Sequence, residues 1–289
     1  MGKKIAIYGA GTIGACQATL TSGNGYSTVV IGHSEEGLSR CRNTMLQNWN
    51  NLIAQKLATA ANRRAAMDLV TITNDVSALR DCDIVFEAVS EDVNIKQRVY
   101  SIITEVCGRD IIVVSTTSSI DAAILAEKIE NPARFLIAHP FQPVHMLPLV
   151  EVVRHTETSE ETLNQVCTLL KDLNRQVVML NRSVPGFLVN RFAQALFRES
   201  IYLIEQGITT AADIDRAIKY AVGMRYASIG LLEYYDAKKI TRRQGDERVG
   251  KGHCTECVSR SLRHKKYPKD HSGGDCLRAH GAKGGPRTL

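Results

Sequence analysis

The sequence predicts an α/β fold, in which helices cover a mainly parallel sheet, followed by a smaller all-α domain. Two observations lead to this prediction. Short apolar runs alternate with helical segments over residues 4–180, as expected for right-handed β-α-β crossovers. From Val184 to Ala237 the pattern is helical only. We therefore expect a first domain over residues 1–184 and a second over residues 185–237.

A glycine-rich turn follows the first apolar run, residues 5–8, and precedes a helical segment. Its spacing is G-x-G-x-x-G. The first glycine makes the tight turn, the second lets a pyrophosphate approach the backbone, and the third lets helix pack on strand. Free N–H groups at the helix start favour phosphate. The residues assigned to a NAD or NADP cofactor are Gly9, Gly11, Thr12, Ile13 and Gly14. The motif favours a Rossmann-type domain, with an ordinary glycine turn as the alternative.

The end of the second predicted strand, residues 28–31, bears on the choice between NAD and NADP. An acidic residue usually holds the ribose 2′-hydroxyl there. This chain has Gly32, His33 and Ser34 instead, with Arg40 following on the next helix. These residues could admit a 2′-phosphate, but Ser34 or the neighbouring glutamate could also hold the ribose. The sequence leaves NAD and NADP both open.

Polar residues follow two further predicted strands, residues 83–89 and 111–114. Glu91 comes after the first, and the hydroxyl cluster that contains Ser118 comes after the second. Ligands of parallel sheets bind outside the carboxyl ends of the strands. Both groups are therefore expected at the cleft, although a solvated loop that caps the helix over residues 121–129 would look the same.

A possible acid–base pair lies further along the chain. His139 ends a predicted strand over residues 135–138, and Glu151 lies inside the apolar segment 149–153. A carboxylate in an apolar strand is costly unless it is paired. Paired with the histidine, it would fix the imidazole tautomer and leave the other nitrogen to take a proton. The alternative is an edge strand from which Glu151 points to solvent.

The helical segments give further expectations. Residues 35–63 are expected to form one long helix anchored by Trp49. A second long helix is expected over residues 187–206, and another over residues 210–222 that stops at Gly223. Wide burial is expected for the apolar residues of the second long helix, which are Phe187, Val189, Phe192, Leu196 and Ile204.

The composition of the chain argues against several classes of protein. The chain of 289 residues has a net charge of +6, but residues 238–289 hold 14 Lys and Arg against 5 Asp and Glu, so the remainder is slightly acidic. The folded body is therefore not expected to bind nucleic acid. No apolar run is long enough for a membrane helix, and scattered cysteines favour a cytoplasmic location.

Segment 238–289 is predicted to be a basic tail outside the fold. Its Cys254-x-x-Cys257 leaves zinc as an alternative, but we expect no metal site.

Over about residues 3–236 the chain resembles the 3-hydroxyacyl-CoA dehydrogenase family. The matching motifs are the glycine loop, the segment Phe86-Glu-Ala-Val-Ser-Glu91 through Lys96, the hydroxyl cluster 115–119, the histidine–glutamate pair, and Pro185-Gly-Phe-Leu-Val-Asn-Arg191. The resemblance implies cofactor contacts for Glu91 and Lys96. It implies catalytic roles for His139 and Glu151, with Ser118 and Asn190 contacting the substrate.

The resemblance implies an oxidoreductase that transfers hydride between NAD(P) and a short (S)-3-hydroxyacyl-CoA, as in fatty acid metabolism. It also implies a homodimer, and a helical domain that is incomplete at its C-terminal end. Residues 223–227, which include Arg225, are similar to the L-gulonate and carnitine dehydrogenase branch. Arg225 could pair with a substrate carboxylate. The alternatives are therefore a dehydrogenase of such a free 3-hydroxy acid, or a non-catalytic protein like lens lambda-crystallin of the same branch.

Overall fold

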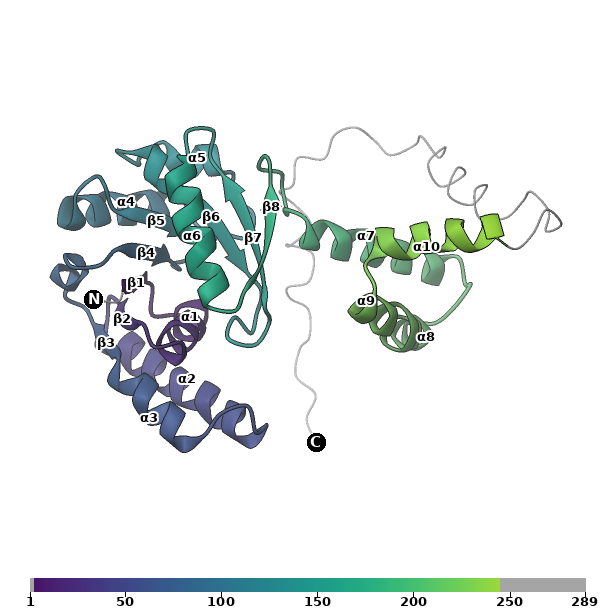
Figure 1. The fold of residues 1–289 in the computed structure, drawn as a ribbon, viewed down its shortest axis with the longest axis horizontal. Coiled ribbons are helices and arrows are strands. Elements are labelled where there is room, and N and C mark those ends of the chain that lie inside the picture. Colours follow the sequence, from purple (N-terminus) through teal and green to yellow (C-terminus); the bar gives the residue numbers. More distant parts are fainter. Residues whose placement is uncertain (1–2, 245–289) are drawn as a thin grey trace, which may run out of the picture. The chain divides into compact units, whose positions relative to one another are not determined.

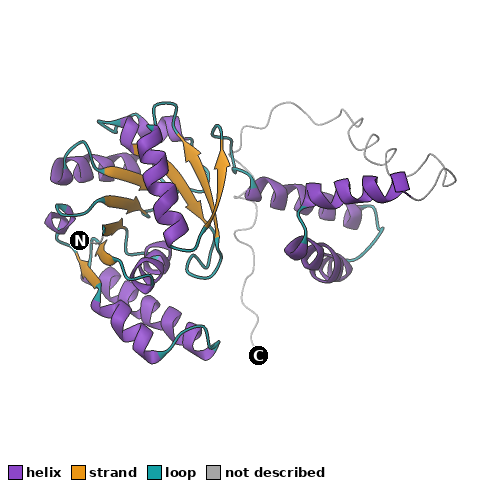
Figure 2. Cartoon of the chain, in the orientation of Figure 1, coloured by secondary structure: helices purple, strands orange, loops and turns teal. Residues whose placement is uncertain are grey.

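The computed structural model describes residues 3–244, and it divides after Ile208 into two compact units. The first unit holds an eight-stranded sheet in the order β3-β2-β1-β4-β5-β6-β7-β8 (Figures 1 and 2). All neighbouring strands are parallel except β6 and β7. The strands are β1 (Lys4–Tyr8), β2 (Ser27–Ile31), β3 (Val70–Thr73), β4 (Ile84–Glu87), β5 (Ile112–Ser115), β6 (Phe135–Pro140), β7 (Leu149–Arg154) and β8 (Gln176–Leu180). The predicted mainly parallel sheet is confirmed.

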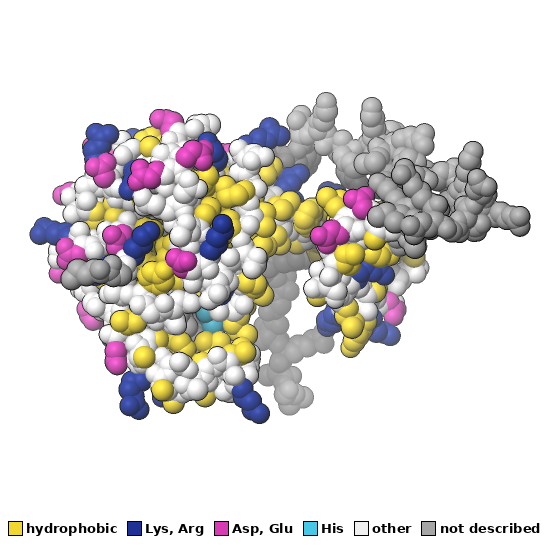
Figure 3. Space-filling view, in the orientation of Figure 1, with side chains coloured by type: hydrophobic (Ala, Val, Ile, Leu, Met, Phe, Trp, Pro, Cys, Tyr) yellow, Lys and Arg dark blue, Asp and Glu magenta, His cyan; other side chains and the backbone are white. Residues whose placement is uncertain are grey.

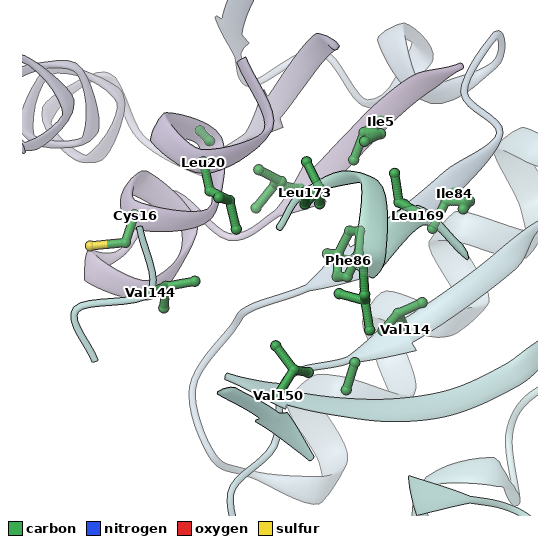
Figure 4. Close-up of a cluster of buried hydrophobic side chains, with 14 of the residues drawn as sticks. Ile5, Cys16, Leu20, Ile84, Phe86, Val114, Val144, Val150, Leu169 and Leu173 are labelled. Atoms are coloured by element: carbon green, nitrogen blue, oxygen red, sulfur yellow. The ribbon is translucent and has the colours of Figure 1, made fainter. Parts of the chain in front are cut away.

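Helices cover both faces of this sheet, as Figure 2 shows. They are α1 (Thr12–Gly23), α2 (Glu35–Ala54), α3 (Ala60–Asp68), α4 (Val93–Cys107), α5 (Ala122–Ala126) and α6 (Glu160–Asp172), with short 3₁₀ turns η1 (Val76–Leu79) and η2 (Pro132–Arg134). One buried cluster joins α1 and α6 to the sheet. In Figure 4, Leu20 of α1 and Leu169 of α6 lie on the same side of the sheet as Phe86. A second cluster joins α4 and α5 to the other face.

The long helix expected over residues 35–63 is in fact two helices, α2 and α3. Lys56 adopts a positive φ of 61° just after α2 ends, a conformation that no helix interior tolerates. Thr59 then caps α3 through a capping box with Asn62, which satisfies N–H groups at the new helix start. The Thr59-x-x-Asn62 spacing was the available signal. Trp49 is buried as expected, at 5% exposure.

The first unit ends with α7 (Val189–Glu205), and the second unit holds α8 (Ala211–Ala217), the π-helix η3 (Ile218–Gly223), α9 (Met224–Ser228) and α10 (Leu231–Gln244). Gly223 does not stop the helix. Its φ of −63° and ψ of −48° are helical, so the chain continues into α9. The expected burial of α7 is also wrong: Phe187 before it is buried, but no residue of the helix is.

Helix α10 continues past Ala237, where we expected the helical domain to end. The predicted tail from residue 245 on, with Cys254 and Cys257 of the zinc alternative, lies outside the described residues. Within the described part of the chain, no group of three or more acidic, histidine or cysteine side chains is arranged to hold a metal ion. No helix there is long and apolar enough to cross a membrane.

Candidate active site

His139 and Glu151 lie directly opposite each other on the antiparallel strands β6 and β7. His139 Nδ1 is 2.9 Å from Glu151 Oε2. Glu151 is completely buried, and His139 is 6% exposed. The alternative of a solvent-facing glutamate on an edge strand does not hold, because β8 pairs with the other side of β7. The predicted pairing of the two residues is therefore present.

The second carboxylate oxygen of Glu151 binds the start of α7. Oε1 accepts the backbone N–H groups of Leu188 at 2.9 Å and Val189 at 2.8 Å. Helix α7 has no side-chain cap from its own N-cap residue, so a carboxylate from the sheet satisfies two of the N–H groups that a helix start leaves free. A negative charge is also favourable at the positive end of the helix dipole. Asn190 lies at the second position of this helix.

The imidazole of His139 is held between aromatic rings. The ring centroid of Phe141 lies 4.6 Å away and that of Phe187 lies 5.5 Å away. Nδ1 is bonded to Glu151, whereas Nε2 makes no hydrogen bond within residues 3–244. The imidazole is thus fixed in place and keeps one nitrogen for a further partner.

A pocket of about 410 Å³ lies beside His139. It brings together six of the residues predicted for the site, namely Ile13, Glu91, Lys96, Ser118, His139 and Asn190. Glu151 does not line this pocket, but it bonds His139, which does. The other predicted cofactor residues do not line it either, namely Gly9, Gly11, Thr12, Gly14, Gly32, His33 and Ser34.

Glu91 connects the predicted cofactor residues to the hydroxyl cluster. Its Oε1 accepts from Thr117 Oγ1 at 2.6 Å and from the backbone N–H of Ser118 at 2.9 Å, while Oε2 lies 3.3 Å from Lys96 Nζ. Burial raises the pKa of Glu91, but these hydrogen bonds and the lysine charge outweigh it, so the pKa lies below the usual 4.5. Glu91 is therefore an ionised acceptor that holds the Ser118 loop.

The sequence prediction missed Glu87, which is completely buried at the end of β4. Its Oε1 accepts from Lys96 Nζ and its Oε2 from Tyr100 and Ser115, each at 2.8 Å. The available signal was a carboxylate inside a predicted apolar strand, residues 83–89. The same kind of signal led to Glu151.

The glycine loop fits a dinucleotide. Gly9 has a φ of +133°, and a Cβ there would lie 2.4 Å from the Ala88 carbonyl oxygen. A Cβ on Gly14 would lie 1.8 Å from the Gly9 carbonyl oxygen, so this glycine allows helix–strand packing. A Cβ on Gly11 would meet nothing within 4 Å. Gly11 thus borders open space at the start of α1, which has no side-chain cap and is suited to phosphate.

The end of β2 leaves the choice between NAD and NADP open. Ser34 accepts from the Gly37 N–H and caps α2. Arg40, considered above for a 2′-phosphate, forms an ion pair with Glu36. A side chain at Gly32 would meet Leu38 Cδ2 at 2.5 Å and Ala10 Cβ at 2.8 Å. This contact explains why glycine suits position 32 here, independently of the cofactor.

Arg225 belongs to the second compact unit. It is exposed, and its guanidinium carbon lies 4.6 Å from the centre of the Tyr234 ring. This is the geometry of a cation–π contact, which orients the arginine within its own unit.

Fold and glycine loop together define a dinucleotide-binding protein, with a histidine–glutamate pair beside its pocket. Two family models match the chain: "3-hydroxyacyl-CoA dehydrogenase, NAD binding domain" over residues 4–183 and "3-hydroxyacyl-CoA dehydrogenase, C-terminal domain" over residues 186–268. The chain belongs to the 3-hydroxyacyl-CoA dehydrogenase family.

Its relatives fall into more than one substrate group. An L-carnitine dehydrogenase of Bacillus cereus is 32% identical over 79% of this chain and 69% of its own length. A 3-hydroxyadipyl-CoA dehydrogenase of Escherichia coli is 31% identical over 80% of this chain and 48% of its own. The crystal structure of FadB2 from M. tuberculosis matches with a TM-score of 0.73 at 29% identity, covering 76% of this chain and 78% of that one.

Proposed function

We propose that this chain transfers hydride between NAD(P) and the 3-position of a short (S)-3-hydroxyacyl-CoA, the 3-hydroxybutyryl-CoA and acetoacetyl-CoA pair. The observation that carries the proposal is the His139–Glu151 pair beside a pocket that also contains Ser118 and Asn190. Such a reaction needs a base at the hydroxyl and donors at the oxygen that becomes a carbonyl. His139 is proposed as the base, and Ser118 and Asn190 as the donors.

The protein's own groups account for the proton. Glu151 holds the Nδ1 proton of His139, so the lone pair of Nε2 is available to the substrate hydroxyl. When His139 takes that proton, the buried Glu151 charge stabilises the imidazolium. Ser118 and Asn190 hold the reacting oxygen. The dinucleotide, when bound at the glycine loop, Glu91 and Lys96, would supply its nicotinamide as the hydride acceptor.

A second candidate substrate is a free 3-hydroxy acid. It is favoured by one specific observation, the similarity to several proteins named L-carnitine dehydrogenase. Arg225 is the residue proposed to pair with the substrate carboxylate in this case, because a guanidinium binds a carboxylate through two parallel hydrogen bonds.

A substrate panel with purified protein separates these candidates. Acetoacetyl-CoA, carnitine and gulonate are each assayed with both cofactors, together with an Arg225→Met variant. The proposal expects turnover of acetoacetyl-CoA that survives Arg225→Met. Turnover of carnitine or gulonate alone, abolished by Arg225→Met, contradicts the CoA proposal. Cofactor binding without turnover of any substrate favours a crystallin-like protein.

We also propose that the chain is a cytoplasmic homodimer, with a dinucleotide-binding domain over residues 1–184 and a helical domain from residue 185. Large apolar side chains of α7 are exposed, including Phe192 at 52% and Phe197 at 61%. Figure 3 shows hydrophobic side chains at the surface where α7 leaves the sheet. Several exposed large apolar side chains on one helix are typical of an interaction site. Sedimentation of wild type and a Phe197→Ser variant tests the proposal, which expects a dimer weakened by the substitution.

A further inference from the structure

Lys96 is an unusual residue for a cofactor site because it is buried rather than exposed. Its side chain is 1% exposed, and it lies on α4 one turn before Tyr100. A buried ammonium group is strongly unfavourable unless it is paired. Lys96 Nζ has two carboxylates within reach, Glu87 Oε1 at 2.8 Å and Glu91 Oε2 at 3.3 Å.

The two carboxylates differ in their surroundings. Glu91 is partly exposed, with 39% of its side chain accessible, and it lines the pocket. Glu87 is fully buried and does not line the pocket. Glu87 is also the closer partner, so it is the main buried carboxylate paired with Lys96 Nζ.

Glu87 itself is rigidly held. Its Oε2 accepts from Tyr100 Oη and Ser115 Oγ, while Oε1 accepts the Val89 N–H at 2.9 Å in addition to Lys96. Burial and the charge of Glu87 raise the pKa of Tyr100 far above its usual value, so its hydroxyl remains a donor. All the hydrogen-bonding capacity of the carboxylate is therefore used by groups on α4, on β5 and in the loop that follows β4.

We infer that Glu87 is a positioning residue of the cofactor site, which acts through Lys96 and does not itself touch the ligands. By pairing with Lys96 and fixing its position, it holds Glu91 against the Thr117–Ser118 loop. The cofactor side and the substrate side of the pocket thus share one hydrogen-bonded network with Glu87 at its buried end. This inference rests on the proposed role of Glu91 and Lys96 in cofactor binding.

The test measures binding of NADH and NADPH directly, by fluorescence of the reduced nicotinamide, and needs no substrate. Glu87→Gln removes the charge with little change of shape. It should weaken binding of the preferred cofactor by about 10-fold or more, the usual worth of a hydrogen bond to a charged group. The matched control is Tyr100→Phe. It removes the hydrogen bond from Tyr100 to Glu87 Oε2, the oxygen that does not bond Lys96, and it leaves the hydrogen bond from Ser115 in place. It should lower the melting temperature but change the dissociation constant less than about 2-fold.

A double variant keeps the test decisive if Glu87→Gln folds poorly. Removing both charges of a buried pair is less damaging than removing one. Glu87→Gln with Lys96→Met should therefore be more stable than Glu87→Gln alone, and should bind the cofactor no worse than Lys96→Met alone. The inference is overturned if Glu87→Gln and Lys96→Met affect cofactor affinity independently of each other. It is also overturned if Tyr100→Phe weakens cofactor binding as much as Glu87→Gln does. If wild type binds neither cofactor, the proposed function fails as well. If wild type binds and Glu87→Gln binds equally well, only the inference fails.

Discussion

Glu151 joins the imidazole of His139 to the first turn of α7: one carboxylate oxygen bonds the imidazole, and the other accepts the N–H of Val189. The same buried charge therefore orients the proposed base and anchors the helix that carries Asn190. Any change at Glu151 should affect proton transfer and the stability of the helix start together.

Glu151→Gln tests this double role. A glutamine has only one oxygen, and the two N–H groups of α7 compete for it with His139. With the amide NH₂ facing Nδ1, the imidazole takes the tautomer in which Nε2 carries the proton and cannot act as a base. We expect kcat to fall by about 10²- to 10⁴-fold, and the free energy of unfolding to fall by about 1.5–3 kcal/mol.

The matched control is Glu161→Gln on α6, where the side chain is 70% exposed. It should leave kcat and the melting temperature close to those of the wild type. A Glu151→Gln protein with wild-type kcat would show that Glu151 does not set the tautomer of His139.

Two glycines of the same loop should respond differently to alanine. A Cβ at Gly11 meets no atom within 4 Å, so Gly11→Ala should change stability by less than about 0.5 kcal/mol while weakening NADH binding. A Cβ at Gly14 overlaps the Gly9 carbonyl oxygen at 1.8 Å, so Gly14→Ala should destabilise the fold by about 1–3 kcal/mol. Thermal unfolding and NADH titration measure both. Unchanged NADH affinity in Gly11→Ala would contradict the assigned pyrophosphate site.

Cofactor preference can be tested at Ser34 without disturbing α2. Aspartate and asparagine both cap a helix as well as serine does, so Ser34→Asp adds a charge and Ser34→Asn serves as its neutral control. We expect the wild type to use NADPH at least comparably to NADH. The aspartate should lower kcat/KM for NADPH relative to NADH by charge repulsion, and the asparagine should not. A strong native preference for NADH would contradict this expectation. Gly32→Asp is the poorer test because its side chain would meet Leu38 and Ala10.

The lowered pKa of Glu91 predicts that part of the stability of the fold is lost at acidic pH. Because its pKa is lowered in the folded protein, ionised Glu91 contributes stability above its usual pKa of 4.5, and this contribution is lost as the pH falls through the folded-state pKa. Glu91→Gln removes the contribution at every pH. The melting temperatures of wild type and variant should therefore converge as the pH falls below 4.5. A difference that stays constant with pH would mean that Glu91 is not stabilised as an anion.

Much of this site could be predicted from local sequence. The glycine spacing identified the loop, and a carboxylate within an apolar strand identified Glu151. Glu87 shows the limit, because its partners Lys96, Tyr100 and Ser115 are brought to it only by the packing of α4 and the β4–β5 pairing. The binding of Glu151 to α7 was likewise not predictable, since it joins residues 37 and 38 positions apart.

The helical part shows why pattern reasoning is less reliable there. Gly223 resembled a helix stop, but a glycine commonly ends a helix by adopting a left-handed conformation, and sequence does not fix that conformation. The apolar face of α7 correctly suggested a helix, but apolar periodicity cannot say which surface covers it. Phe192 and Phe197 are accordingly exposed.

The most direct test of the account is hydride transfer by wild type and His139→Ala, followed through the absorbance of the reduced nicotinamide with acetoacetyl-CoA as substrate. The control is His155→Ala, at a histidine that does not line the pocket. We predict that His139→Ala lowers kcat by about 10²- to 10⁴-fold while its dissociation constant for the cofactor stays that of the wild type, and that His155→Ala retains turnover. Wild-type turnover by His139→Ala would contradict the account.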